Sequence, residues 1–196
     1  MTEGRIVGPD TVRFDRLLPG TLEDVWDFLI RPEHLAKWMA EVTLDAAVGG
    51  KVVLRWTLYH DPNTGEDAEV SVGTIVRFEP PRLISYTWNE PSTDPRAQGR
   101  STSLVAFYLS PSGDGVLLTL THSRLRSDEL SGVSAGRHAL LDILAARLGD
   151  VEPPVFAQRY AQMQQIKALG QYHAERTVRR CHAQHLGPGR SHVPAG

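Results

Sequence analysis

The sequence contains a single cysteine, Cys181, so no disulfide bond can form within the chain, and this fits a reducing compartment. The sequence also lacks any apolar run of about 18 to 20 residues, the length that a membrane-spanning helix needs. Residues 1–10 carry charges, glycine and proline in place of the apolar segment of a signal peptide. We therefore expect a cytoplasmic protein that does not have a membrane as a partner.

Basic charge is scarce over most of the chain. Residues 1–157 contain 15 Lys and Arg against 22 Asp and Glu, whereas residues 158–196 contain 6 against 1. Phosphate groups bind to clustered cations, which an acidic body does not supply. Nucleic acid is therefore not expected as a partner, and only the basic C-terminal stretch keeps that alternative open.

The motifs of several common enzyme classes are missing. The sequence has no GxSxG elbow, no phosphate-binding loop and no Rossmann glycine pattern. The nearest approach to a metal motif is Cys181 with His182 and His185, but adjacent residues point apart on a helix and no second cluster completes a tetrahedron. We expect neither a metal site nor a cofactor.

The apolar content, 41% of 196 residues, suffices for one substantial core but not for two ordinary domains. We expect a ligand-binding domain over residues 1–149, a C-terminal helical extension over 150–186 and a disordered tail over 187–196. The extension carries an apolar stripe at helical spacing, formed by Phe156, Tyr160, Met163, Ile166, Leu169 and Tyr172. This stripe either joins two protomers or folds back on its own body, and a homodimer is slightly favoured.

The first part of the domain predicts one strand and two short helices. An approximate alternation of apolar and polar residues predicts the strand over 11–17, with Leu17 among its apolar members and Arg16 among its polar ones. Thr21 is a good N-cap for the first helix, and Pro32 can open the second.

Between residues 41 and 124 the sequence changes to short runs rich in β-branched and aromatic residues, separated by turn signals. The connections are too short for parallel crossovers, so we predict consecutive antiparallel strands. Their expected ranges are 41–48, 51–59, 69–79, 83–89, 101–110 and 116–124. A long helix follows Gly132, and Gly149 is available as its C-terminal stop. The predicted fold class is α+β, a curved antiparallel sheet of about seven strands wrapped around a long C-terminal helix.

Six short segments give the sequence a resemblance to a known family. They are LPGTLEDVW (18–26), PEHLAKW (32–38), VGG (48–50), GTI leading to FEPPRL (73–83), YTW (86–88) and ALLDIL (139–144). In this order and spacing they resemble the bacterial branch of the activator of heat-shock-protein-90 ATPase family, within the START and Bet v 1-like (SRPBCC) helix-grip superfamily. The resemblance implies a ligand-accommodating cavity between sheet and long helix. It does not imply one activity, because members look like lipid or polyketide binders, cyclases, stress proteins and chaperone stimulators.

One position departs from the family pattern. The family usually places Trp after the glycine near the start of the long helix, whereas Gly136 is followed here by Arg137. A large apolar side chain at the pocket end has become a cation. Either the pocket is smaller or wetter there, or Arg137 faces a polar ligand group, and the ligand cannot be inferred from relatives.

Aromatic side chains are the main candidates for lining such a pocket, since they offer large apolar area and a polar tip. Alternation over 51–59 places Trp56 and Leu58 on the inward face, and Trp56 is the strongest single candidate. The other apolar candidates for ligand binding are Trp26, Trp38, Tyr86, Trp88, Phe107, Leu140, Leu141 and Leu144. Leucine stripes on helices are more often plain core than ligand contacts.

Two polar residues, Arg137 and His122, complete the candidate binding set. Arg137, beside His138, could anchor a carboxylate or phenolate, or it could lie in a solvated first helical turn. His122, if it points inward, has a pKa suited to proton transfer, although most strand histidines are simply hydrogen-bonded. We assign no catalytic residue.

The leading functional hypothesis is binding of a small hydrophobic or aromatic molecule. The alternatives are a polyketide cyclase or dehydratase-like enzyme in the same cavity and, from the family name alone, a protein that stimulates a chaperone ATPase. A cavity without inward charged or histidine side chains would favour binding. An inward His122 near a second polar group would favour catalysis.

Overall fold

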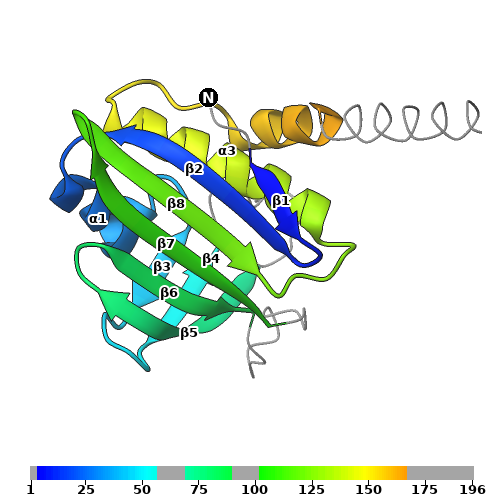
Figure 1. The fold of residues 1–196 in the computed structure, drawn as a ribbon, viewed down its shortest axis with the longest axis horizontal. Coiled ribbons are helices and arrows are strands. Elements are labelled where there is room, and N and C mark those ends of the chain that lie inside the picture. The colour runs from blue at the N-terminus through cyan, green and yellow to red at the C-terminus, as the bar shows by residue number, and fades with distance from the viewer. Residues whose placement is uncertain (1–3, 57–68, 90–101, 167–196) are drawn as a thin grey trace, which may run out of the picture.

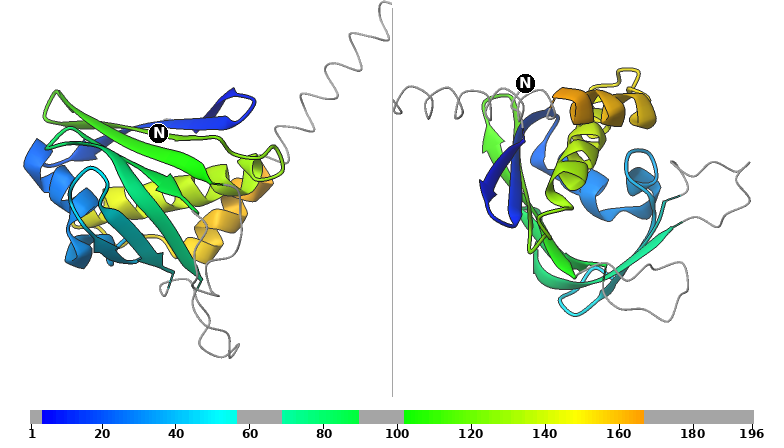
Figure 2. Two further views of the ribbon diagram at one scale, coloured as in Figure 1. Left: turned by 90° about the horizontal axis from the view of Figure 1, so that it is seen from below. Right: turned by 90° about the vertical axis from the view of Figure 1, so that its right-hand side faces the viewer.

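The computed structural model describes residues 4–56, 69–89 and 102–166, and this part of the chain folds around one antiparallel sheet. The strand order is β1-β2-β8-β7-β6-β5-β4-β3. The strands are β1 (Arg5–Gly8), β2 (Thr11–Pro19), β3 (Glu41–Leu44), β4 (Lys51–Arg55), β5 (Val70–Glu79), β6 (Leu83–Trp88), β7 (Ser103–Ser112) and β8 (Gly115–Ser123). The sheet curves around the long helix α3 (Leu130–Leu148), and the short helices α1 (Leu22–Ile30) and α2 (Pro32–Leu35) lie at one end (Figure 1, Figure 2). The predicted helix-grip fold is confirmed.

The sheet has one strand more than predicted. β1 forms an antiparallel hairpin with β2, in which Ile6 lies opposite Val12. Ile6 and Val7 are both more than half exposed. Because neither face of β1 is buried, its sequence has no apolar alternation from which a strand could be predicted.

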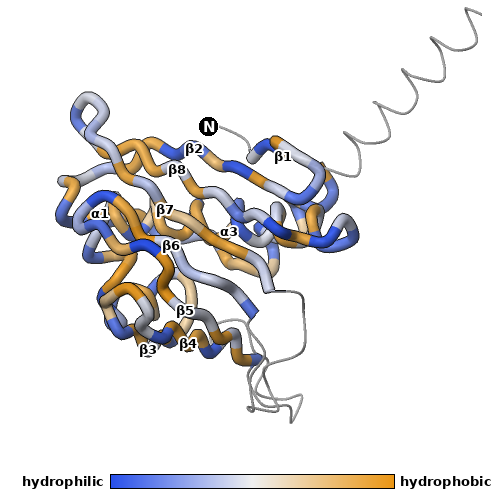
Figure 3. Tube along the Cα trace, turned by 60° about the horizontal axis from the view of Figure 1, so that its bottom comes forward, coloured by the Kyte–Doolittle hydropathy of each residue, from blue (hydrophilic) through white to orange (hydrophobic). Residues whose placement is uncertain are grey.

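The predicted alternation in β2 is wrong at its end. β2 pairs with β8 in unbroken register, from Val12 opposite His122 to Pro19 opposite Gly115. A period of two over this length turns Arg16 inward and Leu17 outward. Arg16 is 6% exposed and Leu17 is 63% exposed, the reverse of the prediction. Hydropathy, by which Figure 3 colours the chain, alternates at the start of β2 but not at its end, where Arg16 follows Asp15 and Leu18 follows Leu17.

The short helices begin as their sequences predict. Thr21 caps α1, because the backbone N–H of Asp24 donates to its hydroxyl at 3.1 Å and the Thr21 N–H donates to the Asp24 carboxylate at 3.0 Å. Pro32 occupies the first turn of α2. α1 buries Val25, Trp26 and Leu29 against the sheet and α3.

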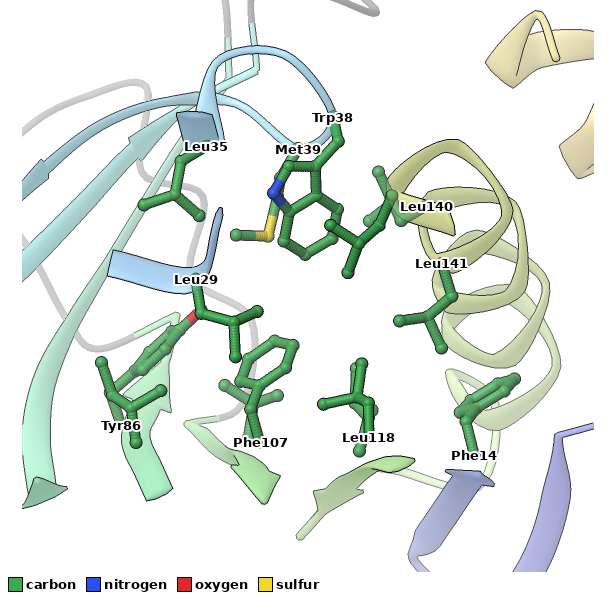
Figure 4. Close-up of a cluster of buried hydrophobic side chains, with 14 of the residues drawn as sticks. Phe14, Leu29, Leu35, Trp38, Met39, Tyr86, Phe107, Leu118, Leu140 and Leu141 are labelled. Carbon is green, nitrogen blue, oxygen red and sulfur yellow. The ribbon is translucent and has the colours of Figure 1, made fainter. Parts of the chain in front are cut away.

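α3 is buried on more than one side. It starts at Leu130, slightly before the predicted Gly132, and ends at Leu148 with Gly149 at the C-cap. Its inner face meets the sheet and the short helices in a core of large apolar side chains (Figure 4). The labelled members include Phe14, Trp38, Phe107, Leu118 and Leu141, each at most 2% exposed. Burying each such side chain contributes about 1.5–3 kcal/mol.

A further helix over residues 156–166 packs on α3, as Figure 1 and Figure 2 both show. Tyr160 lies over two glycines of α3, so a Cβ on Gly132 would lie 3.5 Å from its hydroxyl and one on Gly136 would lie 3.9 Å from its ring. Met163 is buried. Phe156, Tyr160 and Met163 of the apolar stripe thus fold back on their own body, whereas Ile166 is 51% exposed. Leu169 and Tyr172 lie outside the described residues. The homodimer and the disordered tail over 187–196 stay predictions.

No helix in the described ranges is both long enough and apolar enough to cross a membrane.

Candidate ligand-binding site

Four aromatic side chains follow one another on the inner side of the sheet. They come from the residue that follows β4 (Trp56), from β6 (Tyr86 and Trp88) and from β7 (Phe107). The ring centroids are 5.6 Å apart for Trp56 and Trp88, 6.0 Å for Tyr86 and Trp88, and 6.2 Å for Tyr86 and Phe107. These spacings are typical of favourable aromatic pairs. We refer to these four residues as the aromatic row.

A buried polar group adjoins the aromatic row and consists of Arg137 from α3, His122 from β8 and Ser103 from β7. The Arg137 Cζ atom lies 4.0 Å from the centroid of the Trp88 ring, a cation–π contact. Nε and Nη2 of Arg137 lie 3.4 and 3.3 Å from Nδ1 of His122. Nε2 of His122 lies 2.7 Å from the Ser103 hydroxyl oxygen. His122 therefore points inward and has two polar neighbours.

These contacts determine the protonation state of His122. An arginine side chain can only donate hydrogen bonds, so Nδ1 of His122 must accept. The imidazole proton is then on Nε2, which donates to the Ser103 hydroxyl oxygen. The pKa of His122 lies well below its ordinary value of 6.5, mainly because the ring is buried and to a smaller extent because Arg137 is positively charged. The ring is neutral, and both of its nitrogens are engaged.

Arg137 and Tyr86 give the site one cation and one neutral phenol. Burial lowers the pKa of Arg137 to about 10, although Tyr86 acts in the opposite direction. The guanidinium therefore remains charged at neutral pH. Burial raises the pKa of Tyr86 to about 12 despite the nearby charge of Arg137, so its hydroxyl remains protonated.

The remaining predicted site residues lie elsewhere in the core or outside the described residues. Trp26 packs on Phe78 at a centroid distance of 5.6 Å, and Trp38 donates to the Phe28 carbonyl at 2.9 Å. These contacts place both tryptophans at the short-helix end of the core. Leu140, Leu141 and Leu144 are buried on α3 (Figure 4 labels the first two), and Leu58 lies outside the described residues.

Sequence reasoning missed a second, partly buried polar cluster beside α3, formed by Arg16 from β2, His138 and Asp142 from α3, and Arg159 from helix 156–166. Nη2 of Arg16 lies 3.1 Å from His138 Nε2 and 3.4 Å from an Asp142 carboxylate oxygen. Arg159 donates to the other Asp142 oxygen at 2.6 Å. Strict alternation along β2 would have signalled Arg16, and the i, i+4 spacing of His138 and Asp142 shows that they share a helix face.

The alternative of a solvated first helical turn for Arg137 and His138 is wrong. α3 begins at Leu130, so both residues lie about two turns inside the helix, and each is only 5% exposed. Adjacent helix positions point in different directions, and this separates the pair. Arg137 turns to β8, whereas His138 turns to Arg16 on β2.

In the described ranges, no group of three or more His, Cys, Asp or Glu side chains is arranged to hold a metal ion. Cys181, His182 and His185 lie outside those ranges. The expectation that the chain uses no metal or cofactor stays a prediction.

A curved antiparallel sheet that grips a C-terminal helix, with polar side chains between them, defines a helix-grip protein of the START and Bet v 1-like class. Within that class, the family described as Activator of Hsp90 ATPase homolog 1-like protein has a model that matches residues 20–149. The chain belongs to this family.

Solved structures share the fold. A protein of Bordetella parapertussis, determined by solution NMR, is 33% identical with a TM-score of 0.66, covering 84% of this chain and 88% of that one. CalU16 from Micromonospora echinospora is 22% identical with a TM-score of 0.61, covering 86% and 94%. DynU16, a protein in the dynemicin biosynthetic locus, is 19% identical with a TM-score of 0.57, covering 71% and 47%. The search of curated proteins found no match.

Proposed function

We propose that the chain binds a small hydrophobic or aromatic molecule between the sheet and α3. The observation that carries this proposal is the aromatic row with a buried polar group beside it. Small-molecule sites combine apolar and aromatic walls with a few convergent polar groups that fix orientation. Affinity would come mainly from apolar burial, at about 25 cal/mol per Å². The location of DynU16 in a biosynthetic locus supports a small-molecule role for this fold.

Isothermal titration calorimetry with naphthamide, a neutral bicyclic aromatic probe, tests this proposal. We expect binding with a negative heat-capacity change, the mark of apolar burial. Trp56→Leu should weaken binding about tenfold because it removes an aromatic wall. Tyr108→Leu is the matched control, since Tyr108 lies on the same sheet but is 45% exposed.

The proposal fails on a joint negative result. It is overturned if neither naphthamide nor naphthoate binds and if native mass spectrometry of the purified protein detects no retained small molecule. Equal weakening by Trp56→Leu and Tyr108→Leu would also contradict it, because the aromatic row would then have no special part in binding.

A second candidate function is cyclase or dehydratase-like proton transfer, and the inward position of His122 beside Arg137 and Ser103 favours it. Its weakness is that Nδ1 of His122 already accepts from Arg137, so the ring would have to lose that bond to act as a base. The lowered pKa also makes His122 a weak base. Binding therefore ranks first.

Solvent exchange separates the two functions. A proton-transfer enzyme should accelerate replacement of the methyl hydrogens of acetonaphthone by deuterium in heavy water, as followed by NMR. His122→Gln should abolish the acceleration. Absence of acceleration by the wild-type protein contradicts the enzymatic alternative and is the result we expect of a binding protein.

A further inference from the structure

We infer that the ligand is an aromatic acid whose carboxylate pairs with Arg137 while its ring packs on the aromatic row. This inference rests on the proposed function and adds the chemical class of the ligand. The first observation behind it is that only one of the two buried arginines, Arg16 and Arg137, has a carboxylate partner among the described residues.

The two arginines differ in their partners. Arg16 is 6% exposed and has a carboxylate of Asp142 at 3.4 Å. Arg137 is 5% exposed, yet among the described residues no carboxylate lies within 4.0 Å of it. A buried cation is costly unless an anion pairs with it. Arg137 is therefore a buried charge for which the described residues supply no counter-ion.

The hydrogen bonds of Arg137 lead to the same conclusion. Its Nε and Nη2 both approach Nδ1 of His122, at 3.4 and 3.3 Å, so two donors share one lone pair at long range. A carboxylate has two oxygens and accepts two parallel, shorter bonds from a guanidinium. Burial and the neighbouring charge of Arg137, whose donors face Nδ1, keep the imidazole of His122 neutral, so it would not compete with Arg137 for the carboxylate of the ligand.

The surroundings of Arg137 favour an aromatic acid over an aliphatic one. The guanidinium stacks on Trp88, which lies 5.6 Å from Trp56 and 6.0 Å from Tyr86 between ring centroids. A flat ring attached to the carboxylate could continue this series of aromatic contacts. A carboxylate is also preferred to a phenol, because a phenol has an ordinary pKa of about 10 and is neutral at neutral pH.

A pair of probes of equal size tests the inference. Naphthoate and naphthamide differ only in whether the polar end is an anion or a neutral amide. We expect the wild-type protein to bind naphthoate at least about tenfold more tightly than naphthamide at neutral pH and low ionic strength. Arg137→Met should remove this preference, because methionine keeps an apolar contact with Trp88 but has no charge to pair with the carboxylate.

Two further variants separate charge from folding. Arg147→Met makes the same change at an exposed position of α3 and should keep the preference. Arg137→Lys keeps the charge but not the planar fork, and it should restore part of the preference. Equal affinities for the two probes in the wild-type protein, or a preference that survives in Arg137→Met, would overturn the inference while the proposed function stands. Failure of both probes to bind would instead count against the proposed function.

Discussion

Arg137 places a positive charge on a buried face of the core. Its charge is retained in the core because the Trp88 ring and a neutral His122 solvate it. His122 in turn is kept neutral by burial and by Arg137. The two side chains are therefore coupled, and a change at one should be visible in the titration of the other.

Arg137→Met should raise the pKa of His122. Removing the neighbouring positive charge leaves only burial to disfavour the imidazolium, so the pKa should move towards its ordinary value without reaching it. The measurement is the pH titration of the His122 ring by NMR. Arg147→Met, which removes an exposed cation from the same helix, should leave the pKa of His122 unchanged. No difference between the two variants would contradict the coupling.

At the scale of elements, sequence reasoning succeeded where local pattern decides the structure. The Thr21 cap, the Gly149 stop and the inward face of β4 all follow from spacing within a few residues. It failed where a contact joins distant parts of the chain. Strict alternation along β2 would have turned Arg16 inward, but its pairing with Asp142, which is 126 residues away, is contained in no local pattern.

In the candidate site too, local patterns could be predicted from the sequence, whereas contacts between distant elements could not. Alternation predicted that Trp56 faces inward, and it packs against the core together with Tyr86, Trp88 and Phe107, which were also candidates for lining the pocket. That these residues contact a ligand stays a prediction. The hydrogen bonds among Arg137, His122 and Ser103 require the register of β7 with β8 and the docking of α3. Neither can be derived from the sequence of one element.

Asp142→Asn should loosen α3 from both β2 and helix 156–166. The Asp142 carboxylate pairs with Arg16 at 3.4 Å and with Arg159 at 2.6 Å, so its loss leaves a buried arginine without an anion. We expect the free energy of unfolding to fall by about 3 kcal/mol, the lower end for breaking a buried pair, because Asp142 is 17% exposed. Urea denaturation measures this change.

The controls for Asp142 use an exposed pair and the other partner. Asp128→Asn breaks the exposed pair with Arg126 and should cost at most about 1 kcal/mol. Arg159→Met should speed hydrogen exchange over residues 156–166 while sparing the β2 contact of Arg16. If Asp142→Asn costs no more than Asp128→Asn, the second polar cluster does not hold these elements together.

At the scale of the whole molecule, folding is linked to pH in two separate windows. The pKa of Asp15 is lowered chiefly by its hydrogen bond from Arg13, so its contribution is lost only as pH falls below the ordinary carboxylate value of 3.8. The pKa of His122 is also lowered, but from 6.5, so its effect begins at a higher pH. As pH falls, the stability linked to the buried His122 is therefore lost at a higher pH than the stability linked to Asp15 and its surface ion pairs.

His122 should make the protein less stable as pH falls from about 7 to about 5. Below 6.5 the unfolded chain takes up a proton at this imidazole, whereas the folded chain does not, because burial and Arg137 disfavour the charge. Stability then decreases with falling pH by up to about 1.4 kcal/mol per pH unit for this group. Urea denaturation across this range should show a shallower slope for His122→Gln, even if that variant is less stable at neutral pH. Equal slopes would mean that His122 takes up its proton in the folded state, and the neutral imidazole between Arg137 and Ser103 would then be wrong.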